Sequence, residues 1–135
     1  MLRIAAAVLL GLHGLVHLLY LGQSQRLFQL QPGMVWPDGS WAFSRLAGED
    51  GTRLLASVFC VAAAIGFVAS GTGLLARQSW WRPTVVGSAV LSAAMVLLFW
   101  NGRMERLSDQ GGIAPIIHVA ILIAVLVLQW PESVL

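Results

Sequence analysis

The chain has 135 residues, of which 58% are hydrophobic and only 10% charged, and its mean hydropathy is +0.80. These values exclude an ordinary soluble domain. The net charge of +2 comes from eight arginines, which are scattered rather than gathered in a stripe, so we expect no nucleic-acid partner. The single cysteine, Cys60, excludes an intramolecular disulfide and a Cys-x-x-Cys redox pair.

Four apolar runs divide the chain, each close to the ~20 residues that cross a bilayer as a helix. Because an unpaired backbone amide is costly in lipid, runs this long and this uniformly apolar are expected to be helices. The predicted fold class is therefore all-α: an integral membrane four-helix antiparallel bundle forming a single transmembrane domain over residues 1–135. The predicted spans are residues 4–21, 54–75, 84–100 and 113–130.

The three connections differ in length and character. The first, residues 22–53, is rich in Pro and Gly, and its segment 40–46 combines a candidate N-cap, Ser40, with Trp41 and Leu46. This pattern predicts a short interfacial helix. The second connection, residues 76–83, is short and contains "WWRP", whereas the third, residues 101–112, is polar and rich in turn-forming residues.

Tryptophan placement supports helices that alternate in direction. All six tryptophans fall at predicted span ends, where indole rings prefer the headgroup level. They are Trp36, Trp41 and Trp100 on one face and Trp80, Trp81 and Trp130 on the other. The short second connection, with Arg77 and Arg82, resembles a cytoplasmic hairpin, so we expect both termini in the cytoplasm.

The first span ends in "HGLVHLLY", which places His13, His17 and Tyr20 on one face of a helix. Alternating helix directions bring His118 of the fourth span to the same side of the membrane, at nearly the depth of His17. Ionisable residues within a membrane usually face the protein interior and serve a purpose. We therefore expect a polar site near the outer face, formed by His13, His17, Tyr20 and His118. Ser92 repeats at intervals of four with Thr84 and Ser88, a pattern that favours close helix packing.

Four interpretations of this site remain open. Neutral histidines can hydrogen-bond across helices, to Tyr20 or Ser57, and fix which helices pair. A haem b can be held between the first helix and His118. The three histidines are also candidate metal ligands, although no span contains the carboxylate that hydrolytic chemistry would use. The fourth interpretation is a lipid-soluble ligand such as a quinone.

A family resemblance follows from "HGLVHLLY", "WPDGSWAFSRL", "WWRP" and "LFWNGRMERLSDQGG", and the similarity extends over nearly the whole chain. In these segments the chain resembles small bacterial four-helix membrane proteins and is distantly similar to the DoxX-like group. The resemblance implies a multi-pass protein of the bacterial inner membrane, and for some DoxX members a subunit of a redox complex that passes electrons to quinone. Since no paired cysteines are present, we expect an accessory or ligand-binding subunit without independent catalytic activity, associated with itself or with other membrane subunits.

Overall fold

The computed structural model describes the chain except for residues 31, 34–35, 37–38, 101–112 and 132–135. Every regular element in the described part is helical, which confirms the all-α prediction. The elements are α1 (Leu2–Ser24), α2 (Ser44–Leu75), α3 (Trp81–Leu98), α4 (Ala114–Leu122) and the π-helical segment η3 (Ile123–Val127). The predicted third connection, residues 101–112, lies outside the described residues.

Three of the helices, α1, α2 and α3, are long and apolar enough to cross a membrane. The last one is shorter than predicted, since α4 and η3 together cover Ala114–Val127. At about 1.5 Å per residue these 14 residues reach only about 21 Å, less than the roughly 30 Å hydrocarbon core. The described helix therefore falls short of the full fourth span that the sequence predicted over residues 113–130.

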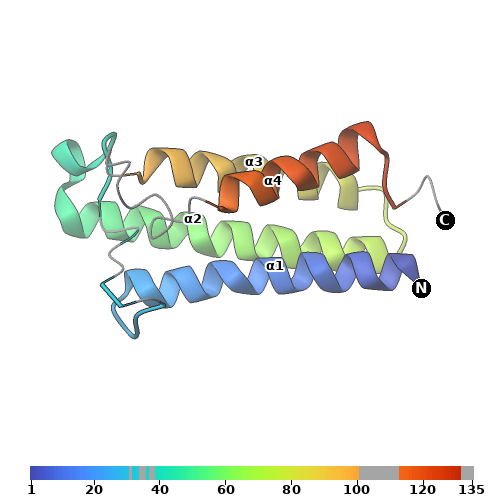
Figure 1. Ribbon diagram of the computed structural model, residues 1–135, viewed down its shortest axis with the longest axis horizontal. Coiled ribbons are helices and arrows are strands. Elements are labelled where there is room, and N and C mark those ends of the chain that lie inside the picture. Colours follow the sequence, from blue (N-terminus) through green and yellow to red (C-terminus); the bar gives the residue numbers. More distant parts are fainter. Residues whose placement is uncertain (31, 34–35, 37–38, 101–112, 132–135) are drawn as a thin grey trace.

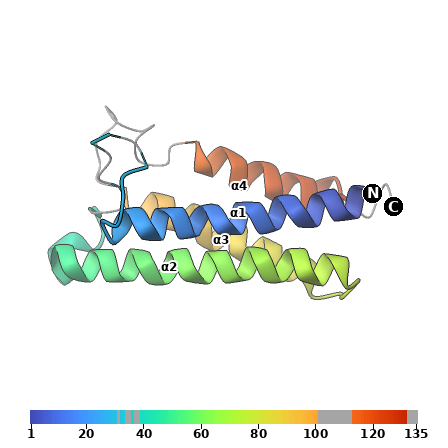
Figure 2. The same cartoon turned by 90° about the horizontal axis from the view of Figure 1, so that it is seen from below.

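The four helices lie side by side and alternate in direction (Figures 1 and 2). Helix α1 packs against α2, α2 against α3, and α3 against α4. Helix α4 makes few direct contacts with α1, even though the two run along the same side of the molecule (Figure 2). The four helices thus pack one after another from α1 to α4, and α1 and α4 are separated from each other.

The start of α2 differs from the predicted interfacial helix. Residues 41–43 form a turn in which the Ser40 hydroxyl accepts hydrogen bonds from the backbone of Ala42 and Phe43, as an N-cap residue does. Helical structure then begins at Ser44, and Gly48, with φ +68°, interrupts it before the long apolar part. Trp41 Nε1 donates to the Leu97 carbonyl oxygen at 2.8 Å, which ties this turn to the end of α3.

Glycines allow α1 and α2 to approach closely. A Cβ placed on Gly14 would lie 2.9 Å from the backbone oxygen of Ala64, and one on Gly71 would lie 2.7 Å from that of Ala7. Both distances are shorter than carbon–oxygen van der Waals contact. Small residues at a membrane helix interface bring backbones together in this way, since packing replaces the hydrophobic effect as the attractive force. The contact at Gly14 presses α1 onto the turn of α2 that carries Phe67.

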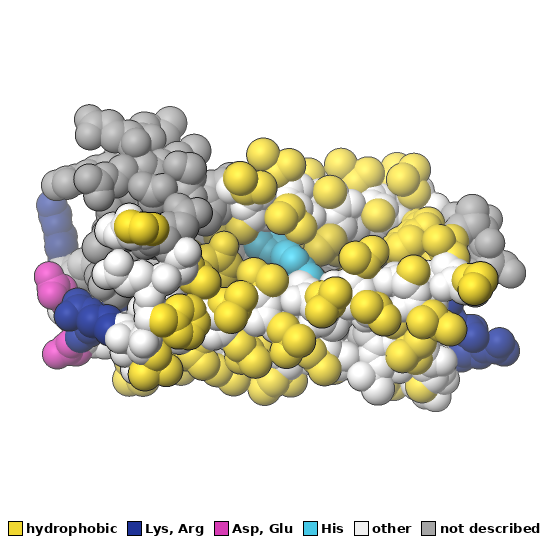
Figure 3. Space-filling model, turned by 60° about the horizontal axis from the view of Figure 1, so that its bottom comes forward, with side chains coloured by type: hydrophobic (Ala, Val, Ile, Leu, Met, Phe, Trp, Pro, Cys, Tyr) yellow, Lys and Arg dark blue, Asp and Glu magenta, His cyan; other side chains and the backbone are white. Residues whose placement is uncertain are grey.

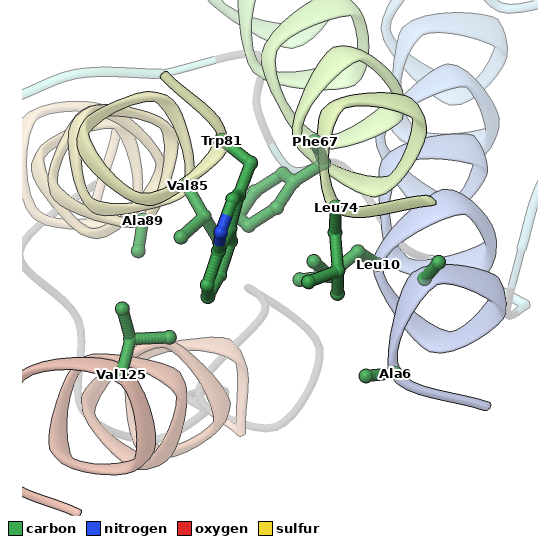
Figure 4. Packing of buried hydrophobic residues seen from close by; sticks show 9 residues of the cluster. Ala6, Leu10, Phe67, Leu74, Trp81, Val85, Ala89 and Val125 are labelled. Carbon is green, nitrogen blue, oxygen red and sulfur yellow. The ribbon is translucent and has the colours of Figure 1, made fainter. Parts of the chain in front are cut away.

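An apolar cluster fills the space between the four helices at one end of the molecule. Trp81 of α3 projects into its centre and is 4% exposed, with Phe67 and Leu74 of α2 on one side and Val125 of η3 on another (Figure 4). This ring bridges helices that would otherwise be separated. A second cluster around Phe99 and Cys60 lies toward the other end.

The close approach of α1 and α2 predicts different effects at neighbouring glycines. Gly14→Ala should destabilise the protein by about 1–3 kcal/mol, because the added methyl meets a backbone oxygen that cannot move alone. Gly11→Ala is the matched control, since a Cβ there meets nothing within 4 Å. Thermal unfolding in detergent can be followed through the reactivity of the buried Cys60 thiol. Equal melting temperatures for the two variants would contradict the packing described here.

Candidate functional site

Three helices contribute polar side chains to one buried cluster. His13 and His17 lie one turn apart on α1, Ser92 lies on α3, and His118 lies in α4. His17 is 2% exposed and His118 is 1% exposed, whereas His13 is partly exposed. The structure thus brings the three histidines together, as alternating helix directions predicted. We call His13, His17, His118 and Ser92 the histidine cluster.

Short contacts link the members of the cluster in a chain. His17 Nε2 lies 2.6 Å from Ser92 Oγ, and Ser92 Oγ lies 2.8 Å from His118 Nε2. His118 Nε2 in turn lies 3.1 Å from His13 Nε2. The Nε2 atoms of all three rings therefore point toward a common centre beside the serine hydroxyl.

Phe67 of α2 supports the imidazole rings from behind. Its ring centroid is 4.6 Å from that of His13, in an edge-on arrangement, and 5.4 Å from that of His17, in a stacked one. Phe67 is fully buried, and the close contact of α1 with α2 at Gly14 holds the histidine-bearing face of α1 against it. The rings are thus held in position by packing as well as by hydrogen bonds.

The hydrogen bonds determine which ring nitrogens carry protons. His17 Nδ1 lies 3.0 Å from the His13 carbonyl oxygen, which can only accept, so the proton of a neutral His17 is on Nδ1. The lone pair on His17 Nε2 then accepts a hydrogen bond from the Ser92 hydroxyl. The Ser92 oxygen in turn accepts a hydrogen bond from the N–H at His118 Nε2. His118 Nε2 has only this one hydrogen, so His13 Nε2 faces it with a lone pair. Two of the three Nε2 atoms therefore present lone pairs to the centre.

The remaining ring nitrogens have no partner inside the cluster. His118 Nδ1 is buried and accepts or donates no hydrogen bond among the described residues. With the lone pair of His13 on Nε2, its proton is on Nδ1, an N–H donor on a ring that is partly exposed. The histidine cluster therefore leaves hydrogen-bonding capacity for a group beyond the protein.

Two cavities adjoin His13, both lined largely by α1 and α4. The first, about 270 Å³, is almost wholly apolar, and the second, about 300 Å³, contains the cluster itself. Ile117 of α4 lines both. The first is also lined by Leu9, Leu10, Leu74, Trp81, Ala124 and Trp130. The second also reaches Tyr20 and Trp36, whose rings pack edge to face at 5.0 Å.

The sequence analysis did not identify Ser92 and Phe67 as members of this site, and it gave other residues a role that the structure does not show. Ser92, expected to serve helix packing, is the hydroxyl at the centre of the cluster, whereas Ser57, expected as a histidine partner, accepts from Gln25 instead. Tyr20 lines the second cavity but makes no hydrogen bond to the described histidines. Phe67 carries no sequence signal that separates it from other apolar residues of the second span. In the structure Ser92, His17 and His118 all lie four to seven residues from the same end of their helices, so a comparison of depth across helices is the signal that could have identified the serine.

A haem between these histidines would require a different arrangement. Metal–nitrogen distances near those of zinc, about 2 Å, place two axial nitrogens on opposite sides of an iron about 4 Å apart. His13 and His118 have Nε2 atoms only 3.1 Å apart and ring centroids 5.2 Å apart, so no layer for a porphyrin exists between them. The observed arrangement favours an ion at the centre of the cluster, or a ligand beside it.

Comparisons with models of known protein families, with curated proteins and with solved structures found no match.

The chain of contacts predicts that Ser92 stabilises the helix assembly. Ser92→Ala should lower the free energy of unfolding by about 1 kcal/mol, because His17 Nε2 and His118 Nε2 both lose their partner. Ser88→Ala is the control, since the Ser88 hydroxyl donates only to the Thr84 carbonyl of its own helix. Denaturation of the detergent-solubilised variants gives both values. If Ser92→Ala were no less stable than Ser88→Ala, the hydrogen-bonded chain would not be a stabilising element.

Proposed function

We propose that the protein is an integral membrane four-helix antiparallel bundle, with a short interfacial helix in the first connection, that binds a lipid-soluble ligand of the quinone class. The ligand site is the opening between α1 and α4. The observation that carries this proposal is that two cavities, both lined by these helices, meet at the partly exposed ring of His13. The proposal includes His17, Tyr20 and His118 in the polar part of the site.

The position of the opening suits a ligand that arrives through the bilayer. Histidine atoms are visible from the side of the molecule, in a hollow flanked by hydrophobic side chains (Figure 3). Helices α1 and α4, which line the two cavities, make few contacts with each other. A lipid-soluble molecule can therefore reach His13 without crossing the packed α1–α2, α2–α3 or α3–α4 interfaces.

The chemistry of the opening suits a carbonyl compound with an apolar body. His13 Nδ1–H is a hydrogen-bond donor in surroundings made mostly of Leu, Ile and Trp side chains, so it favours an acceptor such as a quinone oxygen. The apolar cavity beside it offers aliphatic and aromatic surface for the rest of the ligand, as small-molecule sites do. The two cavities, about 270 and 300 Å³, lie just below and at the lower limit of the usual size range of such sites, about 300–1,000 Å³.

In this proposal the protein acts as an accessory subunit in a bacterial inner membrane, where it binds the ligand for a larger redox complex. Many exposed apolar side chains on α1, such as Leu9, Leu12 and Leu19, are available to lipid or to neighbouring subunits. The distant similarity to DoxX-like proteins is in keeping with this role. Catalysis by the chain alone is not part of the proposal.

One observation favours an alternative to ligand binding, namely a purely structural role for the histidine cluster. The contacts from His17 through Ser92 to His118 join α1, α3 and α4 and would fix their packing without any ligand. This alternative accounts for the buried rings but not for the cavities or the donor on His13. It predicts no saturable ligand binding.

Binding of a short-tailed benzoquinone to the purified protein tests the proposal. Quinones quench indole fluorescence, and Trp81 and Trp130 line the apolar cavity, so saturable quenching is expected. Ala124→Phe fills that cavity from η3 and should weaken binding about tenfold or more, equivalent to about 1.4 kcal/mol. Ala62→Phe adds the same ring to an exposed position on α2 and should leave binding unchanged.

A further substitution separates the hydrogen bond from the shape of the cavity. His13→Leu places an apolar side chain where the two cavities meet and removes the N–H donor. We therefore expect weaker quinone binding, while Trp81 and Trp130, whose fluorescence the quinone quenches, stay in place. Quenching that never saturates, or that is the same in Ala124→Phe and Ala62→Phe, would refute the quinone site.

A further inference from the structure

We infer that the histidine cluster binds a divalent transition-metal ion, such as Zn²⁺, through the Nε2 atoms of His13, His17 and His118. This inference goes beyond the proposed ligand site: the metal would use Nε2 of His13, whereas the proposed hydrogen bond to a quinone uses Nδ1. Three histidines from two helices supply the ligands, and no carboxylate or thiolate in the described part of the chain takes part.

The ligand atoms are already near the spacing that a metal requires. One nitrogen from each ring lies within 4.8 Å of the others, and the His13 and His118 Nε2 atoms are 3.1 Å apart. Nitrogens bound to a tetrahedral zinc at 2.0–2.1 Å lie roughly 3.3 Å from one another. Small rotations of the imidazole rings, with His17 moving from Ser92 toward the centre, are sufficient to place the ion.

The proton arrangement prepares the cluster for a cation. The lone pairs of His13 Nε2 and His17 Nε2 already face the centre, so binding requires only that the neutral His118 ring change tautomer, its hydrogen passing from Nε2 to the unpartnered Nδ1. A metal ion would replace the Ser92 contacts of His17 and His118, and the contact of His13 with His118, by bonds from all three Nε2 atoms to a single cation.

The surroundings include a hydrogen bond, typical of metal-binding histidines, to the ring nitrogen that faces away from the metal. Such histidines usually donate their other N–H to a backbone carbonyl or a carboxylate, which fixes the tautomer and the ring orientation. His17 does so, since its Nδ1 donates to the His13 carbonyl at 3.0 Å. Phe67 adds steric support by stacking against the same ring.

The coordination would be incomplete with protein ligands alone. Three histidines leave a fourth position, as in metal sites that hold a water molecule or an exogenous ligand. The second cavity, about 300 Å³, adjoins the cluster and has room for it. A bound hydroxide there would lower the charge that the ion carries into apolar surroundings. Imidazole ligands favour Zn²⁺, Co²⁺, Ni²⁺ or Cu²⁺ over Mg²⁺ and Ca²⁺, which prefer oxygen.

Cobalt binding to the full chain tests the inference. Protein purified in mild detergent and stripped with a chelator should bind one Co²⁺ per chain, with visible absorption bands that report nitrogen ligands in a tetrahedral field. Zn²⁺ should displace it and remain in stoichiometric amount by elemental analysis. His118→Phe and His17→Phe, which keep a ring at each position, should weaken binding about tenfold or more.

Ser88→Ala is the matched control on α3, outside the cluster. Its hydroxyl donates only to the Thr84 carbonyl of its own helix, so Co²⁺ binding should persist. Ala124→Phe should also retain the metal, which separates this result from that of the quinone experiment. Absence of a saturable Co²⁺ spectrum in the unmodified protein, or equal binding by His118→Phe, would overturn the inference.

Discussion

Three imidazole rings placed among apolar side chains must find hydrogen-bond partners within the protein, because lipid supplies none. This requirement constrains the helix assembly. Ser92 satisfies His17 and His118 at once, so α3 must lie between the helices that carry them, at one particular depth. A shift of one residue along α3 would move the hydroxyl about 100° around the helix and leave both rings without it. Most other contacts in the assembly are apolar and far less specific in register.

Close packing on one side of α1 and its absence on the other follow from the placement of small residues. Gly14 and Gly71 let α1 and α2 approach until backbone atoms meet, whereas α4 presents Ile117 and Ile121 toward α1 across two cavities. The switch to π-helix at η3 widens the backbone beside the apolar cavity, as π-turns do where helices carry function. The histidine cluster therefore lies between a tight interface and an open one.

Much of the fold could be predicted from the sequence, because uniformly apolar runs of about 20 residues have few alternatives to helices. The helical face shared by His13 and His17 follows from their spacing, and the structure places His118 with them. The last helix was predicted to reach Trp130 at the membrane interface, but the described helix ends at Val127, and Gln129, with φ +51°, lies outside helical geometry. Ser92 was missed because its spacing from Thr84 and Ser88 is equally typical of packing, and only depth across helices distinguishes it. The roles of His13, His17, Tyr20 and His118 in binding a ligand stay predictions.

His13 is the residue at which the two proposed sites meet. Its Nε2 atom is the proposed metal ligand, and its Nδ1–H is the proposed hydrogen-bond donor to a quinone. An ion bound at Nε2 requires the proton of a neutral imidazole to be on Nδ1, the nitrogen proposed to donate to a quinone oxygen. Without an ion, the same tautomer depends on His118 keeping its hydrogen on Nε2, 3.1 Å from His13 Nε2, an arrangement that a change of tautomer in both rings would reverse. Metal binding would then remove the competing tautomer and polarise the donor. By thermodynamic linkage, the two ligands should each strengthen the binding of the other by the same factor. A protein this small would thereby couple a buried ion to a ligand entering from lipid through a single side chain.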